Sequence, residues 1–214
     1  MIEAVVFDLD GVLLASEEVW DEVRARYVRE WGGRYDEAAQ RAMMGMSAPE
    51  WSRYIHEQLG VPDSPQEINA EVVRRMVERY RERLPLIPGA RETVEELARR
   101  WPLGLASSSN RELIDAVLEL SGLAPFFRAT VSSEEVARGK PAPDVYLEVA
   151  RRLGVAPERC VAIEDSHAGI RSAKAAGMRV IAVPNPTYPP DPASLAEADL
   201  VVADLSGVRS CISA

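Results

Sequence analysis

The sequence predicts an α/β fold in which a mostly parallel sheet forms the core and a domain of four helices is inserted into it. Two observations support this prediction. Over residues 85–214, short apolar runs alternate with amphipathic helical segments, which is the pattern of parallel strands covered by helices on both faces. Residues 16–84 instead show helical periodicity throughout, so we expect them to form a separate cap on the core.

The first predicted element is a strand at residues 4–7. All of these residues are apolar, as expected for a strand that is buried on both faces. Asp8 and Asp10 follow, and Gly11 allows the chain to turn sharply. Because residues two apart in an extended segment point the same way, the two carboxylates can converge on one point, where a cation or a shared proton would have to neutralise them. Taken alone, the same residues could form an acidic turn after a strand.

Four helices are expected within residues 16–84, because residues with short polar side chains stand where each stretch of helical periodicity begins. These N-cap residues are Ser16, Asp36, Ser47 and Ser64. A glutamate lies three residues after each of the last two, which is the spacing of a capping box. Glycines follow the first and third predicted helices, where they can end a helix.

Helices and strands alternate after residue 85. Helices are expected at residues 88–101, 111–120, 143–153 and 167–176. Strands are expected at residues 103–106, 129–132, 160–163, 179–183 and 200–202. This order implies right-handed crossovers and a Rossmann-like, mostly parallel sheet. The expected domains are therefore a core of residues 1–15 and 85–214 and a helical cap of residues 16–84.

Polar residues follow the predicted strands, and ligands of open α/β sheets bind beyond the carboxyl ends of the strands. Ser107, Ser108 and Asn110 lie where a helix begins, and hydroxyls and free amides at a helix N-terminus suit an anion such as phosphate. A plain serine cap is the alternative. Lys140, held between a glycine and a proline, starts another helix, where a cation opposes the helix dipole. We therefore expect it to have another role, with a solvated loop lysine as the alternative.

Glu164 and Asp165 form a second acidic pair at the end of the apolar run 160–163. With Asp8 and Asp10 they supply the oxygen ligands that Mg²⁺ prefers, and water and a substrate phosphate would complete its coordination. Taken alone, Glu164 and Asp165 could instead be an acidic cap of the helix that follows them. The occurrence of all these groups in order, each after a predicted strand, predicts one site for Mg²⁺ and phosphate.

These motifs resemble those of the haloacid dehalogenase superfamily over essentially the whole chain, including the helical cap. They are Asp8-Leu9-Asp10-Gly11-Val12, Ser107, Lys140 and Glu164-Asp165. The resemblance implies that Asp8 is the nucleophile, which forms an aspartyl-phosphate, and that Asp10 is the general acid and base.

The resemblance also implies how the metal and the phosphoryl group are held. The implied Mg²⁺ ligands are Asp8, the backbone carbonyl of Asp10, and Asp165, with Glu164 in or near the coordination shell. The residues implied to neutralise the transferring phosphoryl group are Ser107, Ser108, Asn110 and Lys140.

The subgroup that the chain resembles contains β-phosphoglucomutase and sugar-phosphate phosphatases. Dehalogenases of the superfamily lack a carboxylate at the position of Asp10, so its presence implies phosphoester chemistry. Trp20, Ala48 and Asn110 stand where the mutase has a histidine, an arginine and a lysine. We therefore expect a Mg²⁺-dependent phosphatase that hydrolyses a small phosphorylated metabolite, a sugar or polyol monophosphate. A β-phosphoglucomutase-type phosphomutase is the alternative.

Residues of the predicted cap are expected to choose the substrate. Trp20, Met46 and Ser47 are expected to shape the pocket, whereas helix packing is the alternative for Met43 and Trp51. A phospho-receiver signalling module is a distant alternative function. Receivers carry the phosphorylated aspartate after a middle strand and have no helical insert of this size, so this alternative is disfavoured.

Composition restricts the possible partners. The 214 residues are 47% hydrophobic and 28% charged, as in soluble globular proteins, and no apolar run approaches the ~20 residues needed to cross a bilayer. The net charge of −9 argues against nucleic acid but allows a small phosphate ester as substrate. Cys160 and Cys211 are too few for a disulfide framework, and no secretory signal is evident. We expect a cytoplasmic enzyme without a membrane partner that is a monomer or a weak homodimer.

Overall fold

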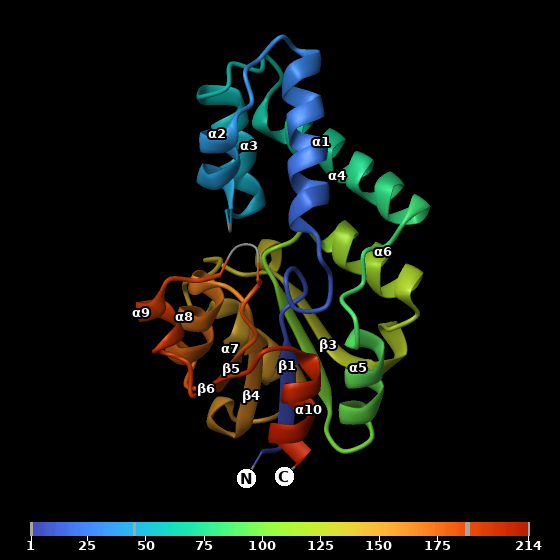
Figure 1. Cartoon of the computed structure of the whole chain (residues 1–214), viewed down its shortest axis with the longest axis vertical. Coiled ribbons are helices and arrows are strands. Elements are labelled where there is room, and N and C mark those ends of the chain that lie inside the picture. The colour runs from blue at the N-terminus through green and yellow to red at the C-terminus, as the bar shows by residue number, and fades with distance from the viewer. Residues whose placement is uncertain (1, 45, 187–188, 214) are drawn as a thin grey trace.

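The computed structural model describes residues 2–44, 46–186 and 189–213. Within them, parallel strands form one sheet in the order β3-β2-β1-β4-β5-β6 (Figure 1). The strands are β1 (Ala4–Phe7), β2 (Leu103–Ser107), β3 (Phe127–Ser132), β4 (Cys160–Glu164), β5 (Arg179–Ala182) and β6 (Leu200–Val201). The predicted α/β fold with a parallel sheet core is confirmed.

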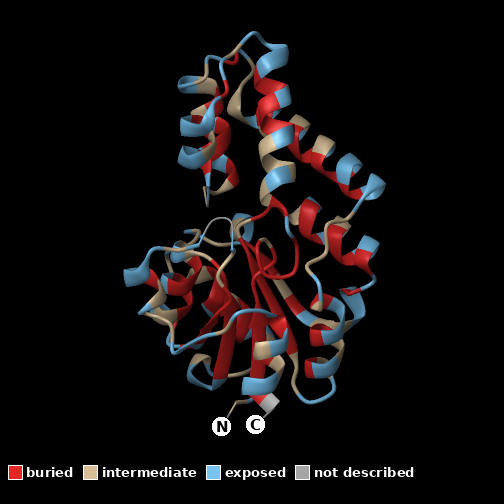
Figure 2. Cartoon of the chain, viewed as in Figure 1, coloured by how far each residue is buried: buried red, intermediate tan, exposed pale blue. Residues whose placement is uncertain are grey.

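Strand β1 lies in the middle of the sheet, between β2 and β4. Its side chains alternate between the two faces, so that Val5 and Phe7 join one hydrophobic cluster and Ala4 and Val6 join the other. All four are fully buried, and Figure 2 shows the central strands in the colour of buried residues. Burial on both faces explains why this strand is uniformly apolar. Its carboxyl end places Asp8 at the centre of the sheet edge.

Helices cover both faces of the sheet. On the face of Ala4 and Val6 lie α7 (Asp144–Leu153) and α8 (His167–Ala175). On the face of Val5 and Phe7 lie α5 (Ala90–Ala98), α6 (Arg111–Ser121) and α10 (Leu205–Ser213). The short α9 (Pro192–Leu195) packs beside α8. None of the described helices combines the length and the apolar character that a bilayer crossing requires.

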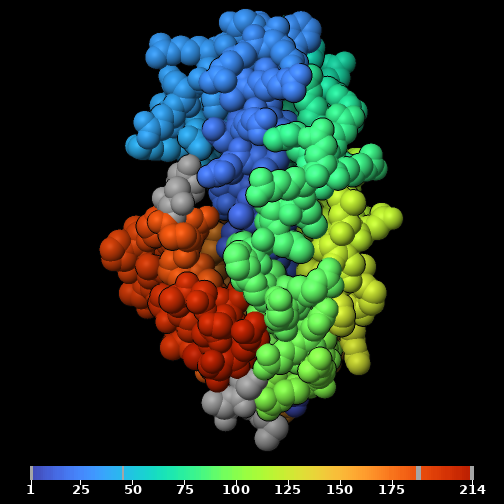
Figure 3. Space-filling view, turned by 45° about the vertical axis from the view of Figure 1, so that its right-hand side comes forward, coloured from blue at the N-terminus to red at the C-terminus, as the bar shows by residue number. Residues whose placement is uncertain are grey.

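A helical insert, residues 17–82, stands beyond the carboxyl ends of the strands (Figure 1). Its helices are α1 (Glu17–Glu30), α2 (Glu37–Met43), α3 (Ala48–Glu57) and α4 (Pro65–Glu82). The two segments that connect it to the core pair with each other, because the Ala15 N–H donates to the Pro85 carbonyl (2.8 Å) and the Ile87 N–H donates to the Leu13 carbonyl (3.0 Å). In the space-filling view the insert sits on the core at one end of the molecule (Figure 3).

The helices of the insert begin at the predicted residues, with one difference in capping. The side chains of Asp36 and Ser64 accept hydrogen bonds from the backbone N–H three residues later, at 3.1 and 3.3 Å. Ser16 precedes α1 as predicted, but its side chain makes no capping hydrogen bond. Its hydroxyl donates to Asp10 Oδ1 instead, at 2.6 Å, because the turn after β1 brings that carboxylate within reach.

Helix α10 was not predicted. Its sequence contains one glycine and three serines among nine residues, and these residues have low helix propensity. The carboxylate of Asp204 accepts hydrogen bonds from two backbone N–H groups of the first turn, at 2.9 and 3.1 Å. Leu205, Val208 and Ile212 are buried in the cluster that includes α5. Tertiary packing therefore supplies the stability that the local sequence lacks.

Candidate active site

A cavity of about 420 Å³ lies between the helical insert and the carboxyl ends of the strands. The core contributes Asp8, Asp10, Ser108, Lys140 and Asp165 to its wall. The insert contributes Trp20, Asp21, Arg24, Tyr35, Met43 and Trp51. The fold thus brings residues from separate strand ends to one place and sets residues of the insert around them. The size is within the range of small-molecule sites, about 300–1,000 Å³.

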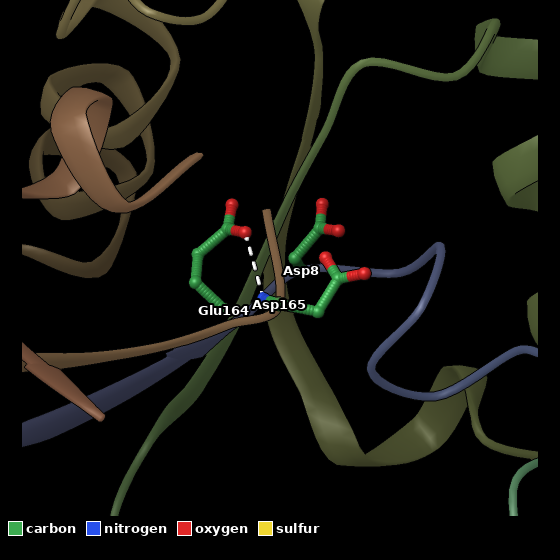
Figure 4. Close-up of side chains that lie close together, drawn as sticks. All are labelled: Asp8, Glu164 and Asp165. Carbon is green, nitrogen blue, oxygen red and sulfur yellow. Dashed lines mark hydrogen bonds between the residues drawn. The ribbon is translucent and has the colours of Figure 1, made fainter. Parts of the chain in front are cut away.

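Three carboxyl groups meet where β1 and β4 end. Asp8, Glu164 and Asp165 place oxygen atoms within 4.8 Å of one another, and all three residues are buried. β1 and β4 are parallel neighbours with Phe7 opposite Ile163, which sets the residues that follow them side by side. In Figure 4 the carboxyl groups of Asp8 and Asp165 lie next to each other, while that of Glu164 is turned aside.

Lys140 is in direct contact with this acidic cluster. Its Nζ lies 2.7 Å from Asp8 Oδ1 and 2.6 Å from Glu164 Oε1, and its side chain is only 4% exposed. Burial by itself would lower the pKa of the ammonium group, but the two carboxylates outweigh that effect and raise this pKa. The lysine therefore stays charged beside the carboxylates.

Glu164 is saturated with hydrogen bonds. Its Oε1 accepts from Lys140 Nζ and from the Tyr146 hydroxyl (2.7 Å). Its Oε2 accepts from the Asp165 N–H (3.0 Å) and from the N–H and hydroxyl of Ser166 (3.2 and 3.1 Å). A carboxylate offers about four lone-pair sites, so Glu164 has none left for a metal in this arrangement. Its role here is to hold Lys140 and the turn after β4.

The remaining carboxylates fit a divalent cation. One ammonium faces three carboxylates, so two negative charges stay unbalanced when all three are ionised. Burial raises the pKa of Asp8, and Lys140 opposes only part of that rise. Burial likewise raises the pKa of Asp165 well above its usual range, and Glu164 adds to the rise. The donors are all oxygens, as Mg²⁺ prefers, so Asp8 and Asp165 are the side chains that would hold it.

Gly11 and Gly169 leave room for the carboxylates. A Cβ atom added to Gly11 would lie 1.8 Å from Asp165 Oδ2, and one added to Gly169 would lie 1.8 Å from Glu164 Oε1. Gly11 also has a φ of +81°, a conformation that residues with a Cβ atom seldom adopt. The glycine that the sequence marked as a turn residue is therefore needed for close approach as well.

Serine hydroxyls hold the carboxylate of Asp10. Ser16 Oγ donates to Oδ1 and Ser109 Oγ donates to Oδ2, both at 2.6 Å, and Ser107 Oγ lies 3.5 Å from Oδ2. No contact with Asp10 was predicted for Ser16 or for Ser109, which belongs to the serine run expected to bind phosphate. The run of serines after β2 was the signal for Ser109, whereas nothing local to Ser16 indicates that it reaches Asp10.

The predicted phosphate-binding residues differ in their placement. Ser108 and Asn110 line the cavity together with Lys140. Ser107 is completely buried and does not belong to the cavity wall, so its contact with phosphate stays a prediction. Asn110 Nδ2 also donates to Asn69 Oδ1 of α4, at 3.2 Å, which links the helical insert to the core beside the site.

The residues expected to shape the pocket also differ. Trp20 and Met46 line the cavity, whereas Ser47 does not. The N–H and hydroxyl of Ser47 both donate to Glu50 Oε2, at 2.7 and 2.6 Å, because the predicted capping box forms and turns this side chain toward its own helix. Gly45, which directly precedes Met46, lies outside the described residues.

Two residues of the cavity wall both pack in the core and shape the pocket, and one residue of the wall was not predicted from the sequence. Met43 and Trp51 are almost fully buried and also line the cavity, so packing and pocket formation are not exclusive. No role was predicted for Arg24, which lines the cavity. Its spacing of four residues from Trp20 places both on one face of α1, and this was the available signal.

Comparisons with known proteins agree with the geometry. Residues 2–177 match the family model of the haloacid dehalogenase-like hydrolases. The chain is 36% identical to the phosphorylated carbohydrates phosphatase of Thermotoga maritima, covering 84% of each chain. It is also 36% identical to hexitol phosphatase B of Escherichia coli, covering 89% of this chain and 87% of that one. The structure of CbbY from Rhodobacter sphaeroides in complex with phosphate is 29% identical, with a TM-score of 0.87 over 97% of this chain and 96% of that chain.

A rise in pH should strengthen Mg²⁺ binding and destabilise the metal-free protein. Burial raises the folded-state pKa of Asp8 and of Asp165 above the unfolded value of about 3.9. The folded chain then binds more protons than the unfolded chain, so this contribution to stability is complete below about pH 4 and is lost as the pH rises through the folded-state pKa values. Mg²⁺ must displace these protons, which makes its affinity rise by about tenfold per pH unit for each proton released.

Thermal denaturation with and without Mg²⁺, at about pH 5.5 and about pH 8, measures this linkage. The rise in Tm on adding Mg²⁺ should be larger at the higher pH, and Asp8→Asn should reduce the difference. An equal rise in Tm at both pH values would show that the cluster does not exchange protons for the metal.

Gly11→Ala should weaken Mg²⁺ binding, because its Cβ would displace the Asp165 carboxylate. Gly154→Ala is a matched control, since Gly154 has a φ of +70° and nothing within 4 Å of an added Cβ. Both substitutions should lower the free energy of unfolding by about 1–2 kcal/mol through backbone strain. Only Gly11→Ala should also lower Mg²⁺ affinity, by about 10–100-fold, as measured by calorimetric titration. Equal affinities in the two variants would contradict the need for close approach.

Proposed function

The chain belongs to the haloacid dehalogenase-like hydrolases and is a phosphoric monoester hydrolase, and we propose that it uses Mg²⁺ to release phosphate from a small sugar or polyol monophosphate. We further propose that the reaction passes through an aspartyl-phosphate on Asp8. The observation that carries the proposal is the position of Asp8. Its carboxylate lies in the cavity wall, 2.7 Å from Lys140 Nζ and within the acidic cluster.

The first step is attack by an Asp8 carboxylate oxygen on phosphorus. The bond between that oxygen and phosphorus forms while the ester P–O bond breaks, and Asp10 gives its proton to the leaving oxygen. In the second step Asp10 takes a proton from a water molecule, whose oxygen attacks the same phosphorus. The Asp8–phosphorus bond breaks, inorganic phosphate leaves, and both aspartates return to their starting states.

Positioned hydrogen bonds prepare Asp10 for this exchange. Each of its carboxylate oxygens receives a serine hydroxyl, from Ser16 and from Ser109, at 2.6 Å. These contacts fix the direction in which the carboxyl group can pass a proton. A general acid and base works only when it lies within hydrogen-bond reach of the reacting oxygen in a defined orientation.

Charge neutralisation is the other requirement. A carboxylate cannot approach a phosphate dianion unless both negative charges are screened. Lys140, held by Glu164 and facing Asp8, would pair with the phosphoryl oxygens. Mg²⁺, held by Asp8, Asp165 and the backbone carbonyl of Asp10, would supply the rest of the screening. Ser108 and Asn110 would add hydrogen bonds from the cavity wall.

The helical insert would act as a cap. It contributes aromatic side chains and methionines to the cavity wall opposite the catalytic groups, and exclusion of water strengthens electrostatic interactions in a site. The two relatives named above act on phosphorylated carbohydrates and on hexitol phosphates according to their names. The similarity of this chain to them over 84% and 89% of its length supports a sugar or polyol ester as the substrate class.

Substitution of the two aspartates separates their roles. With Mg²⁺ and a panel of sugar, polyol and aryl phosphates, Asp8→Asn should reduce phosphate release by about 10³-fold or more. Asp10→Asn, given an aryl phosphate whose leaving group needs no proton, should form the phosphoenzyme and accumulate it. Mass spectrometry after acid quench should then find one phosphoryl group on Asp8.

The control is Asp115→Asn, because that carboxylate is 63% exposed and lies outside the cavity wall. Asp115→Asn should release phosphate at the same rate as the unaltered protein. Phosphate release that survives in Asp8→Asn would overturn the mechanism. Isomerisation of a sugar phosphate without net phosphate release would instead favour the phosphomutase.

Tyr146→Phe should lower kcat by about tenfold with a smaller effect on KM. The lost hydroxyl donates to Glu164 Oε1 at 2.7 Å, so Glu164 and Lys140 would be held less firmly. Tyr27→Phe is the matched control, since its buried hydroxyl donates to Asp63 Oδ2 at 2.5 Å within the insert. Both variants should lose similar stability, and a similar loss of kcat in both would exclude a positioning role for Tyr146.

A further inference from the structure

Arg24 is a charged residue that the mechanism does not use. It lies on α1, is only 8% exposed, and lines the same cavity as Asp8. Its guanidinium carbon lies 4.4 Å from the ring centroid of Trp20 and 4.8 Å from that of Trp51. Such contacts attract the cation to the faces of the indole rings and fix where the guanidinium lies.

One hydrogen-bond donor of Arg24 has no acceptor among the described residues. Among the described residues no carboxylate lies within salt-bridge distance of its guanidinium, and its Nε is buried without an acceptor. Burial lowers the pKa of Arg24 to about 10, so the group remains a cation at neutral pH. A buried guanidinium at the wall of a cavity, with no carboxylate partner among the described residues, can bind a polar group that enters the cavity.

Asp21 provides an acceptor on the same side of α1. It precedes Arg24 by three residues, a spacing that places both on one helix face, and it also lines the cavity. The Tyr35 hydroxyl donates to Asp21 Oδ1 at 2.8 Å. This hydrogen bond fixes the carboxylate, and the other oxygen of Asp21 takes no part in it. The insert thus presents a fixed donor and a fixed acceptor together.

The charge of the cavity decides which ligand group fits this pair. Its wall carries the carboxylates of Asp8, Asp10, Glu17, Asp21 and Asp165. The cations in the described wall are Arg24 and Lys140, and Lys140 is already committed to Asp8 and Glu164. A second anionic group on the substrate would meet this negative excess, including Asp21 next to Arg24. A hydroxyl group both accepts and donates, so hydroxyls can bind Arg24 and Asp21 at once without added charge.

We propose that Arg24 and Asp21, fixed by Trp20, Trp51 and Tyr35, bind hydroxyl groups at the end of the substrate remote from the phosphate. The preferred substrate is therefore a phosphate monoester of an uncharged, polyhydroxylated chain. This inference rests on the proposed phosphatase function and specifies its substrate. Arg24 and Asp21 are specificity residues in it, while Asp8 and Asp10 perform the chemistry.

Three phosphate esters of equal chain length test the inference: hexitol 6-phosphate, 1,6-hexanediol monophosphate, which lacks the intermediate hydroxyls, and 6-phosphogluconate, which ends in a carboxylate. An aryl phosphate reports the chemistry without the subsite. For the unaltered protein with Mg²⁺, kcat/KM for the hexitol ester should exceed that for each of the other two chains by about 100-fold, because unpaired polar groups in a site penalise a ligand that cannot bond them.

Arg24→Met should remove this preference. The loss in kcat/KM on the hexitol ester should exceed the loss on the aryl phosphate by about tenfold or more. Arg24→Lys, which keeps the charge but not the planar fork, should show a smaller loss of the same kind and serves if the methionine variant fails to fold. Arg26→Met is the matched control on the same helix, since that side chain is 76% exposed, and it should retain the full preference.

Several results would overturn the inference. Equal kcat/KM for the hexitol and hexanediol esters in the unaltered protein would show that no hydroxyl subsite exists. A preference for 6-phosphogluconate that Arg24→Met abolishes would make this an anion subsite. An equal loss on every ester in both Arg24 variants would make Arg24 structural. If the aryl phosphate and all the chains release no phosphate, the proposed function itself fails; if only the discrimination is missing, the subsite alone fails.

Discussion

One electrostatic constraint shapes this structure: buried carboxylates must be held close together against their mutual repulsion. Asp8, Glu164 and Asp165 come within 4.8 Å of one another, and Lys140 balances part of their charge. Such a cluster persists only when a rigid scaffold imposes it. The adjacent parallel strands β1 and β4 provide that scaffold, and the absence of a side chain at Gly11 lets the carboxylates meet.

The same constraint gives different tasks to side chains of the same type. Every hydrogen-bond site of Glu164 is occupied, so it holds Lys140 in place, while its neighbour Asp165 turns its carboxylate toward Asp8. Asp10 likewise differs from Asp8 in its hydrogen bonds, because serine hydroxyls donate to both carboxylate oxygens of Asp10. A fully bonded polar network keeps each group in one orientation, and the proposed two-step transfer of a phosphoryl group and a proton would require such fixed orientations.

The helical insert supplies what the strand ends lack. The core offers carboxylates, an ammonium and hydroxyls, whereas the insert adds indole rings, methionines and a guanidinium to the same cavity. The insert is also tied to the core beside the site, through the hydrogen bond between Asn69 and Asn110, and Ser16, which directly precedes the insert, bonds Asp10. In the proposed function, the core would perform the chemistry and the insert would select the substrate, and both line the same cavity.

Most of the strands and helices, the helical insert, and the acidic and basic groups that follow the core strands could be predicted from the sequence. Periodicity, capping residues and the end of an apolar run are local features, so they can be seen without the fold. Three features became visible only in the folded chain: α10 forms, Ser16 bonds Asp10 instead of capping a helix, and Glu164 holds Lys140. The fold also places Arg24 at the cavity wall, with no carboxylate partner in the part of the chain that the structure describes. These outcomes depend on contacts between residues far apart in the chain, and only close packing determines which polar group meets which.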